Sequence, residues 1–122
     1  MQLSKEIRKI VNDAKSAGQA PIMATIAGQE YIYRSINRAE WRSVMVERNK
    51  GLKELEELGE AATDEQLAEF EDTQMKAIID VACLYPSDMK PDSLPAGALQ
   101  SLSEYILQES GFGGAEVEPI KL

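Results

Sequence analysis

The sequence predicts an α+β domain that is mainly α-helical, in which a β-hairpin packs against three to four helices. Its 122 residues fit one domain, and its 43% of apolar residues suffice for one modest core. Several segments carry apolar residues at helical spacing, whereas one pair of segments alternates around a glycine turn. We expect an N-terminal amphipathic helix at 1–18, the hairpin and helical core at 19–112, and a flexible C-terminal tail at 113–122.

The first helix is expected to begin after Ser4, whose hydroxyl suits an N-cap, and to end before the stop signal at Gly18. Its apolar residues share one face: Leu3, Ile7, Ile10, Val11 and Ala14. Such a helix either docks on the core of its own chain or folds against a partner. We favour docking on its own chain.

A β-hairpin is expected from segments 21–26 and 30–36, joined around Gly28-Gln29. Glycine at the first central position predicts a two-residue type II′ turn, because glycine adopts positive φ at little cost. Tyr31 and Tyr33 alternate with Ile32 and Arg34, which predicts a sheet with two different faces. A lone hairpin is marginal in water, so helices or a neighbouring chain must cover it.

A capping box predicts the start of the next helix, with Asn37 as N-cap and Glu40 reaching back to it. This helix is expected to run to Gly59. Gly51 lies inside it and marks the place where a kink or break would form, since glycine costs about 1 kcal/mol there relative to alanine.

A second capping box at 63–66 predicts a helix that continues to about Leu84, where Tyr85-Pro86 closes it. A loop with three prolines follows. A last helix is expected from apolar residues at 99–106 and ends at Ser110-Gly111-Phe112.

The charge is unevenly distributed along the chain. Residues 1–53 hold ten Lys/Arg and five acidic residues (+5), and residues 54–122 hold three Lys and sixteen acidic residues (−13), which sum to −8. This net charge argues against nucleic-acid binding, which needs clustered cations. The asymmetry suits either an attracted basic partner or head-to-tail self-association, although solvated helix faces would give the same pattern.

The residue types argue against catalysis. The chain has no histidine and a single cysteine, Cys83, so Ser-His-Asp and Cys-His arrangements are excluded. Gly111 and its neighbours lack the Lys-Ser/Thr pair and the following helix of a phosphate-binding loop. Acidic residues such as Glu54, Glu57 and Glu69 lie on faces that we interpret as solvated. We therefore expect no enzymatic activity, no cofactor and no metal, and we interpret Cys83 as structural.

No membrane segment is expected, because no apolar run approaches the roughly 18–20 residues that cross a bilayer. The first residues also lack the apolar block of a signal peptide. A single cysteine excludes an internal disulfide, and the simplest compartment is the reducing interior of a cell.

Several short motifs in order resemble a known family. They are the aromatic strand and helix start at 30–41, Leu84-Tyr85-Pro86, Leu94-Pro95-Ala96-Gly97, and Glu109-Ser110-Gly111-Phe112. Across residues 29–112, this order resembles small tail proteins of tailed bacteriophages. Such proteins are tail assembly chaperones or structural subunits of the tail or baseplate.

The resemblance implies a protein without enzymatic activity that binds other phage tail proteins, such as the tape measure, tube or baseplate components. A chaperone would coat the hydrophobic tape-measure protein in the host cytoplasm during assembly, whereas a structural subunit would remain in the tail of the virion. Self-association is left open. A third hypothesis, from a different class, is a small acidic regulator that binds a host protein.

We expect the protein contacts in two clusters. The first holds Tyr31, Tyr33, Arg34, Arg38 and Trp41, and the second holds Leu94, Pro95 and Phe112. Exposed aromatic residues often mark interfaces. The alternative interpretation is that Tyr31, Tyr33 and Trp41 are core residues.

Overall fold

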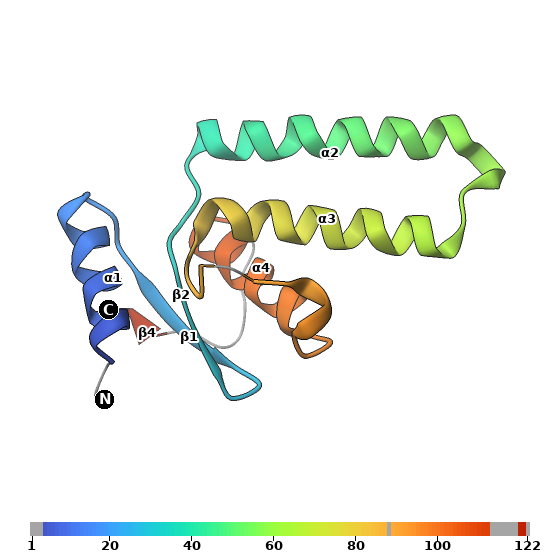
Figure 1. Ribbon diagram of the computed structural model, residues 1–122. Coiled ribbons are helices and arrows are strands. Elements are labelled where there is room, and N and C mark those ends of the chain that lie inside the picture. The colour runs from blue at the N-terminus through green and yellow to red at the C-terminus, as the bar shows by residue number, and fades with distance from the viewer. Residues whose placement is uncertain (1–3, 88, 113–119, 122) are drawn as a thin grey trace.

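A four-stranded antiparallel sheet, with strand order β3-β2-β1-β4, has helices on both faces (Figure 1). The computed structural model describes residues 4–87, 89–112 and 120–121. The elements are α1 (Lys5–Ser16), β1 (Ile22–Ile26), β2 (Gln29–Tyr33), α2 (Arg38–Leu58), α3 (Asp64–Ala82), β3 (Cys83–Tyr85), α4 (Ala98–Glu109) and β4 (Ile120–Lys121). The predicted mainly helical α+β fold is confirmed.

The alternation of side chains along β1 and β2 divides the core into two layers. Tyr31 and Tyr33 point to the face that is covered by α3, α4 and the start of α2. Met23 and Ile32 point to the other face, where they contact α1. The larger layer consists of Ile22, Ala24, Tyr31, Tyr33, Ile36, Val44, Ile78, Ile79, Ala82, Leu99, Leu102 and Ile106.

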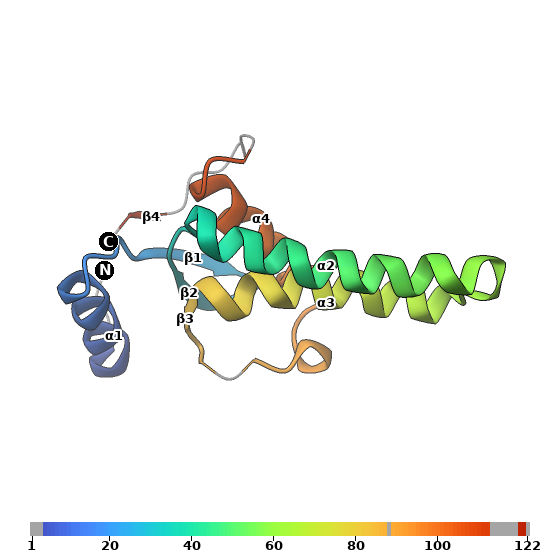
Figure 2. The ribbon, with the colours of Figure 1, turned by 90° about the horizontal axis from the view of Figure 1, so that it is seen from above.

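Helix α1 docks on the sheet of its own chain, as favoured from the sequence. The Ser4 hydroxyl accepts a hydrogen bond from the Ile7 amide at 3.2 Å, so the predicted N-cap is present. Ile7 and Val11 are buried against Met23 and Ile32. This contact covers the face of the sheet that α3 and α4 leave open (Figure 2).

The hairpin forms, but its turn differs from the prediction. Ile26 pairs with Gln29, so the two loop residues are Ala27 and Gly28 rather than Gly28 and Gln29. Both have positive φ, 51° and 82°. Two positive φ values are the requirement of a type I′ turn, whereas type II′ needs only one. The predicted type II′ turn is therefore wrong: the loop lies one residue earlier in the sequence, and it is a type I′ turn.

Both predicted capping boxes are present. In the first, Asn37 Oδ1 accepts from the Glu40 amide at 2.8 Å, and Glu40 Oε1 accepts from the Asn37 amide at 3.1 Å. The second joins Thr63 and Gln66 in the same way. Helix α2 runs without interruption through Gly51 and ends where Gly59 takes a positive φ of 55°. The glycine at 51 therefore has another role, which the packing of α2 on α3 explains.

Helix α3 ends earlier than the sequence predicts. It stops at Ala82, and Cys83–Tyr85 forms β3, which pairs with β2. The backbone amide of Arg34 also donates to the Ala82 carbonyl at 3.0 Å. These inter-strand hydrogen bonds replace the last helical turn that the apolar residues 83–84 had predicted.

The C-terminal segment contributes to the sheet. Ile120–Lys121 forms β4 and pairs with Ile22 and Met23 of β1. The flexible tail expected at 113–122 includes these two residues, which pair with β1. The remainder of that prediction, at 113–119 and 122, lies outside the described residues.

Candidate protein-binding surface

Helices α2 and α3 form an antiparallel hairpin, hereafter the arm (residues 38–82), that projects away from the sheet (Figures 1 and 2). Val44 near its base is buried, as are Ile78, Ile79 and Ala82 at the end of α3. From Met45 to Ala77, every residue is described and no side chain is buried. Two helices can cover only one stripe of each other, so the outer part of the arm has no closed core of its own.

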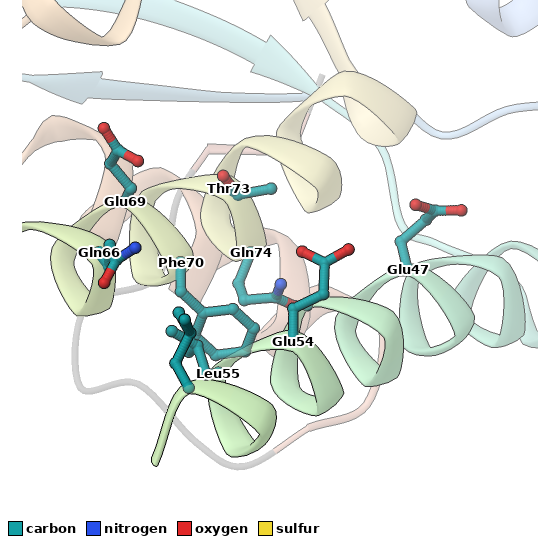
Figure 3. Close-up of a pocket in the computed structure, with 10 residues that line it drawn as sticks. Glu47, Glu54, Leu55, Gln66, Glu69, Phe70, Thr73 and Gln74 are labelled. Atoms are coloured by element: carbon teal, nitrogen blue, oxygen red, sulfur yellow. The ribbon is translucent and has the colours of Figure 1, made fainter. Parts of the chain in front are cut away.

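A groove of about 290 Å³ lies between α2 and α3 in this outer part. Its apolar residues are Gly51, Leu55, Leu58 and Phe70. A Cβ atom at Gly51 would lie 2.9 Å from Phe70 Cε2, so only glycine lets the ring come this close to α2. Figure 3 shows the Phe70 ring directed from α3 toward α2, beside Leu55. Gly51 is thus a packing residue and not a helix break.

The polar residues of the groove are acidic or uncharged. They are Glu47, Glu54 and Glu69, together with Gln66, Thr73 and Gln74 (Figure 3). No lysine or arginine lines the groove. The outer segment 54–71 carries eight acidic residues and no basic ones: Glu54, Glu56, Glu57, Glu60, Asp64, Glu65, Glu69 and Glu71. An apolar groove in a strongly negative surface can accept an apolar side chain that is flanked by cations.

Two apolar side chains of this region are exposed, Leu58 in the groove and Leu67 outside it. Leu58 is 41% exposed and Leu67 is 46% exposed. Leu67 lies three residues before Phe70, on a neighbouring position of α3. The outer arm therefore combines open apolar surface with negative charge.

Two of the residues predicted to bind a partner are core residues instead. Tyr31 and Tyr33 are both 0% exposed, because α3 and α4 cover their face of the sheet. In this fold neither ring can contact another protein. The alternative interpretation as core residues applies to both. Burial also raises the pKa of each phenol above its ordinary value.

Arg34 holds the base of the arm together. Its guanidinium donates to both carboxylate oxygens of Glu40, at 2.9 and 2.6 Å, and to the Val81 carbonyl at 2.8 Å. The hydrogen bond from Arg34 lowers the pKa of Glu40. Arg34 thereby ties the start of α2 to the end of α3. Arg38, by contrast, is exposed to solvent.

The two predicted contact clusters meet at one point. Trp41 of the first cluster and Phe112 of the second pack with ring centroids 4.6 Å apart and planes tilted by 47°. Phe112 is 45% exposed, and Trp41 is partly buried against the larger core layer. Leu94 packs on the same layer, whereas Pro95 is exposed. The Trp41–Phe112 pair is thus a second apolar surface, at the base of the arm.

The sequence prediction missed the groove. Its acidic residues Glu54 and Glu69 were interpreted as solvated helix faces, and Gly51 as a weak point of the helix. The usable signal was the spacing of Gly51, Leu55 and Leu58 at i, i+4 and i+7 on one helix, with Phe70 on the next helix. A small residue opposite a ring indicates close helix packing.

Cys83 lies at the junction of α3 and β3, and its thiol donates to the Tyr85 carbonyl at 3.3 Å. Burial raises the pKa of this thiol to about 11 from an ordinary value of 9.0. The thiolate is the reactive form of cysteine, so Cys83 is poorly suited to act as a nucleophile.

We expect Cys83 in the folded protein at pH 8 to react with iodoacetamide about 100-fold more slowly than in guanidinium chloride, because two pKa units remove that fraction of thiolate. Mass spectrometry of timed samples measures both rates. Equal rates would show that the thiol is open to solvent.

The same shift predicts that the stability which Cys83 contributes is complete below pH 9.0 and decreases as the pH rises toward about 11, since the unfolded state loses its proton first.

Within the described ranges, no group of three or more His, Cys, Asp or Glu side chains is arranged to hold a metal ion. None of the described helices is both long enough and apolar enough to span a bilayer. No protein-family model, curated protein or solved structure significantly matches the chain. The candidate site is therefore defined by its geometry alone.

Proposed function

We propose that the chain is a non-enzymatic morphogenesis protein of a tailed bacteriophage, a tail assembly chaperone that binds another tail protein such as the tape measure. It would act in the host cytoplasm during assembly. The family resemblance of residues 29–112 supplies the phage context, and the arm supplies the binding surface.

The observation that carries this proposal is the arm, in which no side chain from Met45 to Ala77 is buried. A two-helix projection of this length gains stability when a further helix covers its open apolar stripe. A partner that is itself a long apolar helical protein would supply such a helix. The strong negative charge also limits association between copies of the chaperone, because like charges repel.

A permanent structural subunit of the tail or baseplate is the second candidate. The Trp41–Phe112 pair favours it, because this pair forms a further apolar surface at the base of the arm, away from the groove. A subunit with several permanent neighbours needs more than one such surface.

Quantitative mass spectrometry of infected cells and of purified particles tests the proposal. For the phage that encodes this chain, we expect the chain to co-purify with a tail protein from lysates and to be absent from finished particles. Recovery in particles at fixed stoichiometry would identify the structural subunit instead. Failure to associate with any tail component in either fraction would overturn both.

A further inference from the structure

We propose that the groove between α2 and α3 binds a basic amphipathic α-helix of the partner protein. This inference names the partner chemistry of the proposed function and rests on it only in assuming a protein partner. The packing of Gly51 on Phe70 shapes the groove, and the glutamates that line it set its charge.

The shape of the groove suits a helix. Helix α2 has 21 residues and α3 has 19, so the arm is about 30 Å long at 1.5 Å per residue. A third helix laid along the seam would place an apolar side chain over Leu55, Leu58 and Phe70. Recognition of a helix in an apolar groove uses anchors at i, i+3, i+4 and i+7. The third helix would extend the hairpin toward a bundle.

The carboxylates that line the groove favour a partner helix with positive charge. Glu47 and Glu54 are seven residues apart on α2, about 10 Å along its axis, and Glu69 on α3 is among the residues that line the groove. A partner helix with lysine or arginine at a similar two-turn spacing would meet one carboxylate with each cation. Of these carboxylates, Glu47 already pairs with the exposed Lys50 of its own helix at 3.4 Å. Glu54 and Glu69 are therefore the main carboxylates that the groove offers to a partner cation.

A second copy of the chain is a poorer occupant. The basic amphipathic helix α1 of a second copy already has Ile7 and Val11 buried against its own sheet, so it cannot offer an apolar face to the groove. The net charge of −8 on each copy adds a long-range repulsion. An anionic membrane surface is disfavoured for the same reason. A cationic helix, in contrast, is attracted at long range and gains apolar contact on docking.

The test uses the full-length chain and two fluorescent synthetic peptides, one an amphipathic leucine–lysine helix and the other its leucine–glutamate counterpart. Fluorescence anisotropy is expected to show binding of the lysine peptide only, weakened by added salt. The double variant Glu54→Lys/Glu69→Lys should bind at least about tenfold more weakly. The control Glu56→Lys/Glu71→Lys has the same net charge and lies on the same arm, but outside the groove, and should bind within about threefold of the unmodified chain.

An apolar variant separates the groove from simple charge attraction. Leu58→Asp places a charge in the groove at a side chain that is already 41% exposed, so the arm should keep its helical circular dichroism while binding falls about tenfold or more. Peptide binding that is lost equally in the groove variant and its control would reduce the effect to bulk charge and overturn the inference. Absence of binding would also overturn it. So would a dimeric mass in light scattering that Leu58→Asp reduces to the monomer mass, because a second copy would then occupy the groove. None of these results affects the particle experiment, which tests the proposed function separately.

Discussion

Replacing Tyr33 with alanine is expected to lower the free energy of unfolding by about 3–5 kcal/mol. Tyr33 is 0% exposed and lies on β2 in the core layer between the sheet and helices α3 and α4. Alanine would leave a cavity where the ring now contacts this layer, and close-packed neighbours fill such space only in part. Denaturant unfolding followed by circular dichroism measures the change.

Tyr33→Phe is the matched control, because it keeps the ring and removes only the hydroxyl. Tyr33 Oη is buried and has no hydrogen-bond partner among the described residues. Removing an unpaired buried hydroxyl should change stability by less than about 1 kcal/mol, and in the stabilising direction if the hydroxyl lacks bound water. A loss for Tyr33→Phe as large as that for Tyr33→Ala would contradict this description and show that the hydroxyl makes a bond essential to the core.

The tyrosines also show what the sequence could and could not predict. Alternation along residues 31–34 correctly predicts that Tyr31 and Tyr33 share a face of the sheet. It carries no information on what covers that face. Coverage depends on α3 and α4, which are distant in sequence, and the same alternation fits either a buried face or an interface.

Local signals were the most reliable. The two capping boxes and the stop at Gly59 depend on hydrogen bonds and dihedral angles within a few residues, and all are present. The end of α3 depended on pairing with β2, a contact between distant segments. Three apolar residues at 83–85 do not distinguish a last helical turn from a short strand, so the sequence prediction failed there.

The sequence did not predict the groove, because the groove also depends on the arrangement of segments that are distant in sequence. Leu55 on α2 and Phe70 on α3 each belong to the apolar stripe of an amphipathic helix, and the spacing within a stripe is the same whether the chain covers it or leaves it open. Only the three-dimensional arrangement shows that the groove is lined by α2 and α3 alone. Once the groove is known, the acidic residues that line it indicate the charge of a binding partner.

Replacing Arg34 with methionine is expected to lower the free energy of unfolding by about 2–3 kcal/mol. The Arg34 and Glu40 side chains are 17% and 27% exposed, so loss of the guanidinium leaves a largely desolvated carboxylate and an unpaired Val81 carbonyl. Arg38→Met is the control, because that arginine is exposed nearby, and its effect should stay within about 0.5 kcal/mol. Equal losses in the two variants would contradict a special role for Arg34 at the base of the arm.

The pH dependence of the same pair supplies an independent measurement. Since the hydrogen bond from Arg34 lowers the pKa of Glu40 below its ordinary value of 4.5, the folded state holds fewer protons than the unfolded state in that range. The stability from this pair is therefore complete above pH 4.5 and is lost as the pH falls through the lowered pKa. In Arg34→Met the loss of stability on acidification from pH 7 to pH 4 should be smaller than in the unmodified chain. In Arg34→Met/Glu40→Gln the loss of unfolding free energy should be smaller than the sum of the losses in the two single variants, because each single change already breaks the shared ion pair. Strict additivity in this cycle, measured by denaturant unfolding at pH 7 and pH 4, would mean that the two side chains stabilise the protein independently.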